Sequence, residues 1–181
     1  IYNLIELLTG ARFTTSFTRV GGQTRDLPPG FLEGVKEFSE QFVGRLDEFG
    51  KMLNRNRIFV DRTKDVGVIS AETALDFGLT GPNLRGSGNE YDVRKYFPYL
   101  GYETYDFEVP VGRTGDCYDR FAVRMEEMRQ SVKILLQAVA KMPGGAWMVD
   151  DPKNVLPPKD KVLTKMEELI HQFLVVTQGP D

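Results

Sequence analysis

The stretch GLTGPNLRGSGNEYDVRK combines four glycines with basic residues and a serine, the residue types that cradle phosphates in proteins. A P-loop needs Gly-x-x-x-x-Gly-Lys-Ser/Thr between a strand and a helix. Gly81 and Gly86 have this separation, but Ser87 and Gly88 stand where the lysine and the hydroxyl residue belong. A dinucleotide fingerprint would need a third glycine, where a tyrosine stands. The stretch therefore predicts tight turns, for which glycine supplies positive φ, in place of a nucleotide site.

Two arginines of the same stretch, Arg85 and Arg94, are expected to pair with carboxylates of the chain or of a neighbouring subunit. Arginine suits such interface ion pairs better than lysine does, because its planar guanidinium binds a carboxylate through two donors. With Gly86, Ser87 and Gly88, these arginines are predicted to be structural or interface residues.

Cys117 is the single cysteine of the chain, which excludes an internal disulfide and fits a reducing compartment. It stands at the expected start of a helix, where the pKa of a thiol can fall. A nucleophile also needs a base, and the single histidine, His171, belongs to another expected helix. Contact between the two helices is geometrically allowed, but we interpret Cys117 as an inert structural or interface residue.

No catalytic or metal-binding residue is predicted. His171 alone cannot build a metal site, and no cluster of Cys, His, Asp or Glu residues with the spacing of a metal site accompanies it. Glu126 can pair with Arg129 and Gln130 at i+3 and i+4, which predicts an ordinary helix face. A di-iron bundle needs two Glu-x-x-His motifs, which a sequence with a single histidine cannot supply.

Apolar residues at steps of three and four predict three long helices, over about 31–54, 117–142 and 159–177. In the second of these the apolar residues repeat every seven positions, which is typical of a helix in a bundle. In the last helix, Leu163, Met166, Leu169, Ile170 and Phe173 are expected to face inward.

Minor β structure is expected at the margins. Residues 105–111 alternate apolar and polar side chains and predict a strand, which Pro110 restricts to a sheet edge. An extended segment with a turn is predicted around Gly21 and Gly22. The fold class is therefore α+β and mainly helical, and residues 1–181 are expected to form a single central helical domain.

Composition narrows the possible partners. The 181 residues carry a formal net charge of −3, so a general binder of nucleic acid or of anionic membranes is not expected. No apolar run approaches the roughly 18 residues of a membrane span, and no signal peptide is visible. The sequence starts within an apparent helix at Ile1, without methionine, and reads as a fragment of a longer polypeptide.

Four blocks of the sequence together resemble one known family. They are LTGARFTTSFTRVGGQTRDLPPGF, DVGVISAETALDFGLTGPNLRGSGNEYDVRK, VPVGRTGDCYDRFAVRMEEMRQSVKIL and MPGGAWMVDDPKNVLPPK. In order and spacing they resemble the 49-kDa subunit of respiratory complex I, whose bacterial form is the D-type subunit of the NADH–quinone oxidoreductase. The likeness covers essentially the whole chain.

The resemblance implies a fold shared with the large subunit of nickel–iron hydrogenases, and a place in the peripheral arm of a proton-pumping enzyme. That arm lies on the cytoplasmic side of the bacterial inner membrane, or on the matrix side in mitochondria. The complex uses NADH, FMN, iron–sulfur clusters and quinone in or between other subunits, and this fragment is expected to bind none of them. The implied partners are other subunits, notably the adjacent iron–sulfur-cluster subunit, with quinone held between the two.

The resemblance also implies what this chain lacks. The family's proposed quinone-binding histidine and tyrosine, and an aspartate linked to that histidine, lie upstream of Ile1, in a region that includes an N-terminal β-domain. A C-terminal segment follows Asp181. His171 should therefore not inherit the quinone role, and the expected cavity-flanking residues are the four that leave the first helix, Thr9, Gly10, Ala11 and Arg12.

Two other functions stay open at this point. The chain could belong to the large subunit of a membrane-bound, energy-converting hydrogenase-like complex, which paired Cys-x-x-Cys motifs at both ends of the full sequence would indicate. It could also be a stand-alone helical interaction module without a redox role.

Overall fold

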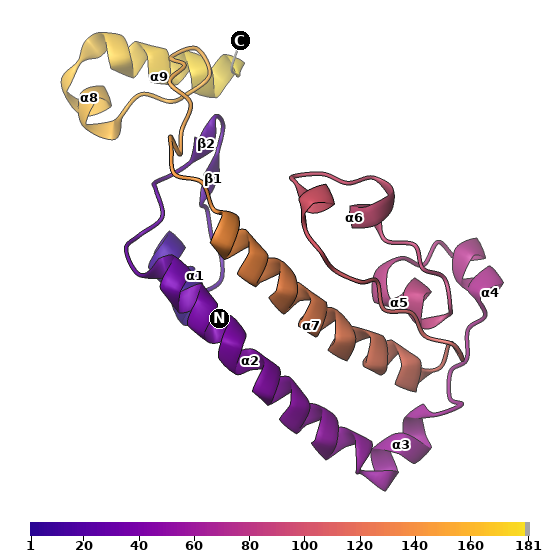
Figure 1. Ribbon diagram of the computed structural model, residues 1–181. Helices are drawn as coiled ribbons and strands as arrows, with labels where there is room; N and C mark the ends of the chain where they lie inside the picture. Colours follow the sequence, from indigo (N-terminus) through magenta and orange to yellow (C-terminus); the bar gives the residue numbers. More distant parts are fainter. Residues whose placement is uncertain (180–181) are drawn as a thin grey trace. The chain divides into compact units, whose positions relative to one another are not determined.

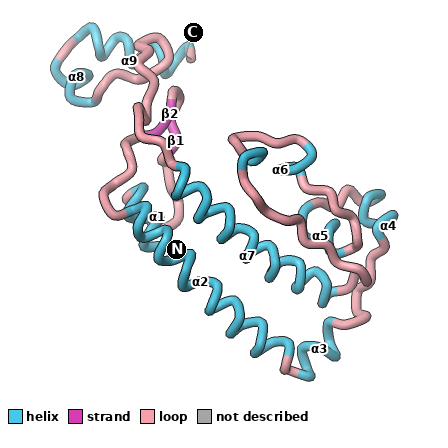
Figure 2. Tube along the Cα trace, in the orientation of Figure 1, coloured by secondary structure: helices cyan, strands magenta, loops and turns pink. Residues whose placement is uncertain are grey.

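The computed structural model describes residues 1–179 and is mainly helical, with one short two-stranded sheet (Figures 1 and 2). The mainly helical α+β class predicted from the sequence is therefore confirmed. The chain divides into two compact units. Unit 1 comprises Ile1–Phe31 and the chain from Pro143 onward, and unit 2 comprises Leu32–Met142. That residues 1–181 act as one domain stays a prediction.

Unit 1 begins with helix α1, Tyr2–Thr9, which ends at Gly10 with a left-handed φ of 80°. The guanidinium of Arg25 donates to the carbonyls of Leu7 and Leu8 at 2.7–3.1 Å, so a positive charge satisfies the C-terminal carbonyls of this helix.

A β-hairpin follows in unit 1, formed by β1 (Thr18–Arg19) and β2 (Gly22–Gln23). The segment around Trp147 joins this hairpin, because Gln23 N donates to Trp147 O at 3.0 Å and Val149 N donates to Gly21 O at 2.9 Å. A Cβ on Gly22 would collide with Trp147 O, so glycine is required where the two segments meet.

The last helix predicted over 159–177 is two helices. Helix α8, Lys159–Thr164, and helix α9, Met166–Gln178, are separated at Lys165, whose φ of −128° and ψ of 128° are extended. The break lets α8 and α9 pack against each other and buries Val162. Sequence periodicity continues across the break, so it could not reveal a single extended residue.

Unit 2 is built on two long helices, α2 (Phe31–Asn54) and α7 (Cys117–Lys141), which lie side by side (Figures 1 and 2). Their bounds agree with the predicted ranges to within one residue. Arg129 donates to Asp47 at 2.8 Å, and the Tyr118 hydroxyl donates to Asn54 at 3.0 Å, so polar contacts bridge the two helices.

Short helices complete unit 2. They are α3 (Arg57–Thr63), α4 (Ala71–Asp76), α5 (Gly81–Gly86), α6 (Val93–Tyr96) and a 3₁₀ turn at Tyr102–Thr104. Helices α3 and α5 pack on α7, and α4 packs on α5. No helix within residues 1–179 combines the length and apolar character that crossing a membrane requires.

The strand predicted over 105–111 is wrong. The segment is extended, but its backbone groups bind side chains of α7 instead of a neighbouring strand. Gln137 accepts from Asp106 N at 2.9 Å and donates to Asp106 O at 2.7 Å, and Gln130 accepts from Glu108 N at 3.1 Å. Two glutamines seven residues apart on one helix face thus replace part of a β-ladder.

Candidate functional site

The glycine-rich stretch forms α5 and the loop after it, and it packs directly on α7. At Gly86 the backbone of α5 comes close to α7, because a Cβ there would lie 2.8 Å from Arg120 Cγ. The carbonyl of the preceding residue, Arg85, accepts from Gly112 N at 2.8 Å. This hydrogen bond attaches the segment around Gly112 to α5. Gly81 and Gly88 have φ values of 61° and 93°, so the predicted positive-φ turns are present.

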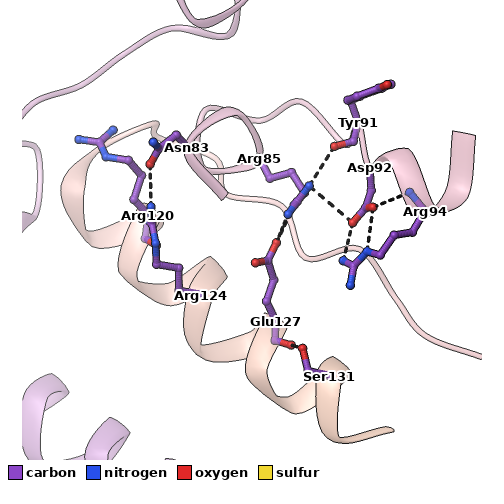
Figure 3. A network of polar contacts seen from close by, with 9 residues as sticks. All are labelled: Asn83, Arg85, Tyr91, Asp92, Arg94, Arg120, Arg124, Glu127 and Ser131. Atoms are coloured by element: carbon purple, nitrogen blue, oxygen red, sulfur yellow. Dashed lines mark hydrogen bonds and ion pairs between the residues drawn. The ribbon is translucent and has the colours of Figure 1, made fainter. Parts of the chain in front are cut away.

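Arg85 is the centre of a buried polar network (Figure 3). Its side chain is only 7% exposed. The guanidinium donates to Glu127 on α7 through Nε at 2.7 Å and also through Nη2. Nη1 donates to Tyr91 O at 3.1 Å and lies 3.5 Å from an oxygen of Asp92. Every nitrogen of this guanidinium therefore faces a partner within the chain.

Asp92 links Arg85 to Arg94 within the network. Its carboxylate caps α6 by accepting from Arg94 N at 2.9 Å, and it receives the Arg94 guanidinium at 3.0 and 2.6 Å. Burial alone would raise the pKa of the Asp92 carboxyl, but the hydrogen bonds and charge of Arg94, with the charge of Arg85, hold that pKa below its ordinary value.

Aromatic rings lie next to Arg94, at one end of the network. The Arg94 guanidinium lies 4.9 Å from the centre of the buried Phe107 ring and 5.9 Å from that of Tyr102. The hydrogen bond to Asp92 raises the pKa of Arg94 above its ordinary value. Both arginines thus form the ion pairs expected from the sequence, and both pairs are internal to the chain.

This arrangement excludes the phosphate cradle at Arg85, whose donors already bind protein acceptors. Two guanidiniums face two carboxylates, so no net charge remains to attract an anion. No buried side-chain nitrogen or oxygen of the described residues is left without a partner. Chemically, the network joins α5, α6 and α7 through ion pairs whose partners all lie within the chain. An interface role for Arg85, Gly86, Ser87, Gly88 and Arg94 stays a prediction.

A second polar cluster lies at the start of α7. Asp116 caps the helix by accepting from Asp119 N at 2.7 Å, and it also accepts from Asp65 N at 2.9 Å. Burial alone would raise the pKa of Asp116, but these backbone donors, Tyr118 N and the charge of Arg120 hold that pKa below its ordinary value. The sequence reveals the cap but not the contact with Asp65, which lies far away along the chain.

Cys117 is half-buried in this cluster, and Arg120 Nη2 lies 3.2 Å from its sulfur. His171 lies in unit 1, where its Nε2 contacts Pro152 O. Glu126 accepts from Arg129 at 3.2 Å and from Gln130 at 2.8 Å, so the ordinary helix face predicted for it is present. Within residues 1–179, no three His, Cys, Asp or Glu side chains are grouped as metal ligands.

The expected cavity-flanking residues lie in unit 1. Thr9 Oγ1 donates to Ile5 O at 2.8 Å and accepts from Ala11 N at 3.2 Å, which shapes the exit of α1 around Gly10. Arg12 pairs with Glu6 at 3.3 Å and remains largely exposed. Their role beside a cavity stays a prediction.

The acidic partners Asp92, Glu127 and Asp119 in the two clusters were not predicted from the sequence. Asp119 accepts from Arg113 N at 2.7 Å and from Thr114 N at 2.6 Å. A capping signal exists for Asp92, one residue before the short helix α6. Glu127 carries no such signal, because its partner Arg85 lies 42 residues away on another element.

Comparison with known proteins gives one consistent result. A family model described as "Respiratory-chain NADH dehydrogenase, 49 Kd subunit" matches residues 1–181. The chain is 64% identical to the D-type NADH-quinone oxidoreductase subunit of Methylacidiphilum infernorum over 181 residues, which is 100% of this chain and 43% of that protein. It is 60% identical to a D-type subunit of the same enzyme from Opitutus terrae, over 99% of this chain and 42% of the relative.

A third relative, the D-type subunit of Akkermansia muciniphila, is 56% identical over 99% of this chain and 43% of its own length. The chain thus spans less than half the length of the curated relatives that it matches. All three relatives are named as NADH-quinone oxidoreductase subunits, and none of their names refers to a hydrogenase.

Proposed function

Because this chain belongs to the family of the respiratory-chain NADH dehydrogenase 49-kDa subunit, we propose that it is part of the quinone-site subunit of a proton-pumping NADH–quinone oxidoreductase. In that enzyme electrons pass from NADH through iron–sulfur clusters to quinone. The observation that carries the proposal is the match of the family model to all 181 residues.

The part played by residues 1–181 is structural support without a redox centre. An iron–sulfur cluster is held by about four cysteine thiolates, whereas this chain has one cysteine. Buried Arg85 on α5 pairs with Glu127 on α7 and with Asp92 at the start of α6, so these pairs fix three elements of unit 2 in one geometry, which suits a scaffold that docks other subunits. NADH, FMN, the clusters and quinone are assigned to other subunits or to boundaries between subunits.

The proposed partners are other subunits of the complex, first among them the adjacent iron–sulfur-cluster subunit, with quinone held between the two. The proposed location is peripheral, at the cytoplasmic face of a bacterial inner membrane or the matrix face of the mitochondrial one. We assign the exit of α1, Thr9 to Arg12, to the flank of the quinone cavity, and the overall fold to the type of the nickel–iron hydrogenase large subunit.

The function is tested by disrupting the gene and measuring NADH-driven proton uptake by inverted membrane vesicles. Uptake should be lost on disruption and restored by the wild-type gene, and unchanged uptake would refute the proposal. Arg85→Met should lower the amount of assembled enzyme while leaving quinone reduction per assembled enzyme unchanged, because Arg85 is a buried support residue. Arg57→Met, at an exposed pair with Asp61, is the matched control and should change neither quantity.

The cavity-flanking role has a separate test. Arg12→Ala in the assembled enzyme should raise the KM for quinone, with little change in the amount of enzyme. If both the quinone kinetics and assembly equal those of the wild type, Arg12 does not flank the cavity.

A further inference from the structure

Helix α9 is amphipathic, but its polar side faces its own chain. Glu168 and His171, on one side of the helix, are half-buried, and His171 Nε2 contacts the carbonyl of Pro152. Val175 continues this side one turn later and is also half-buried. These three residues line a cleft of about 1000 Å³ within unit 1.

The opposite side of α9 is apolar and exposed. Met166, Ile170, Phe173 and Leu174 follow the i, i+4, i+7, i+8 spacing of one helix face, and their exposed fractions are 67%, 53%, 62% and 46%. Leu163 at the end of α8 is 75% exposed. A helix of a globular protein normally buries such a face, so the arrangement points to a covering element that the described residues of unit 1 do not supply.

We propose that the apolar face of α9, defined by Met166, Ile170, Phe173 and Leu174, is covered by an apolar segment of the same polypeptide outside residues 1–181. This inference rests on the proposed function, because it takes the full subunit to be as long as its relatives. In the most similar of the relatives described above, the matching stretch makes up only 43% of the protein, so more than half of the chain is available to cover the face.

The remainder of the same chain is favoured over a second copy or another subunit for two reasons. Elements close in sequence usually lie close in space, and α9 runs to Gln178, near the end of these residues. The face itself also carries no charge, whereas surfaces between separately folded subunits have a polar rim around a small apolar centre. A continuous four-residue apolar face resembles the interior of a domain.

Site-specific photocrosslinking in the assembled enzyme identifies the covering segment. Phe173→p-benzoylphenylalanine keeps an aromatic side chain within the face, and mass spectrometry then locates the crosslinked peptide. The expected product joins position 173 to a peptide of the same subunit outside residues 1–181. Mixing isotopically light and heavy enzyme shows whether the crosslink lies within one copy.

Four results would overturn the inference: a crosslink to unit 2 of the same chain, a crosslink to another subunit, a crosslink to a second copy, or no crosslink above the control. The control is Phe77→p-benzoylphenylalanine in unit 2, an equally large aromatic residue with 79% exposure. A failure of the proposed function gives a different result. In that case no other complex subunits co-purify with the tagged chain, while the crosslink within the chain is still observed.

Discussion

Unit 2 buries apolar and charged side chains together, among them Leu46, Val123, Arg85 and Asp92. In the described residues of unit 1, only Val162 is buried. Both units contain amphipathic helices, so helix formation does not explain the difference. In unit 2 the Arg85–Glu127 pair and the buried apolar side chains find their partners within the unit. In unit 1 the apolar face of α9 is not covered by the described residues of that unit.

This contrast can be measured because spectroscopic probes differ between the units. The single tryptophan, Trp147, lies in unit 1, whereas every tyrosine except Tyr2 lies in unit 2. Tryptophan fluorescence in a urea titration therefore reports on unit 1, and the near-ultraviolet circular dichroism of tyrosine reports mainly on unit 2.

The largest effect is expected from Arg85→Met in unit 2. The substitution leaves Glu127 without its main partner and removes one cation from Asp92, and breaking a buried ion pair costs about 3–5 kcal/mol. We expect the free energy of unfolding reported by tyrosine to fall by about 4 kcal/mol. Arg57→Met should leave it unchanged, since that arginine is 92% exposed. Equal results for the two variants would show that the network does not stabilise unit 2.

A core truncation compares the two units directly. Leu46→Ala empties a site that is 1% exposed and should cost about 3 kcal/mol in the tyrosine signal. Phe173→Ala in unit 1 removes a larger side chain, but its exposure predicts a change within about 0.5 kcal/mol in the tryptophan signal. A comparable loss in both variants would mean that α9 already buries its apolar face within this chain and that the two units do not differ in this respect.

Features that depend on contacts within one helix, such as its position and its cap, can be predicted from the sequence. Periodicity located α2 and α7. Asp116 and Ser70, residue types that favour the start of a helix, accept from Asp119 N and Thr73 N respectively. Such signals are local, because the residues involved lie within one or two helical turns. The ion pairs of Arg85 and Arg94 were expected, but their partners could not be named.

The incorrect predictions concern contacts between elements that lie far apart in the sequence. The strand over 105–111 was predicted from alternation, which cannot show that Gln130 and Gln137 bind the backbone in place of another strand. The inward face predicted for 159–177 was wrong because Leu163, Met166, Ile170 and Phe173 are exposed. Periodicity identifies an apolar face but not the element against which it packs, and the described residues of unit 1 do not supply that element.

A smaller and more local contrast comes from two glycines with similar backbone angles. Gly115 in unit 2 and Gly10 in unit 1 have φ values of 75° and 80°. A Cβ on Gly115 would collide with Ile69 O, whereas nothing lies within 4 Å of a Cβ on Gly10. Gly115→Ala should therefore cost about 3 kcal/mol, from overpacking added to backbone strain, and Gly10→Ala about 1 kcal/mol. Equal costs would show that backbone strain alone decides both positions.

The smallest effect is expected from acid titration. The pKa values of Asp92 and Asp116 in unit 2 lie below their ordinary value in the folded state, because the hydrogen bonds that each carboxylate accepts outweigh the opposing effect of burial. Each therefore contributes stability above the unfolded-state pKa of about 4, and this stability is lost as the pH falls through the lower folded-state pKa.

The tyrosine-detected urea midpoint should accordingly fall between pH 5 and pH 3, taken as about one unit on either side of the unfolded-state pKa. Asp92→Asn should flatten this dependence, since asparagine has no carboxyl to protonate, although it lowers the midpoint at pH 7. Asp151 in unit 1 also has a pKa below its ordinary value, through hydrogen bonds from Asn154 and Lys153 N, but it is not buried. Asp151→Asn should leave the tyrosine-detected pH dependence unchanged, and a flattening as large as that of Asp92→Asn would show that the acid sensitivity does not arise in the buried network of unit 2.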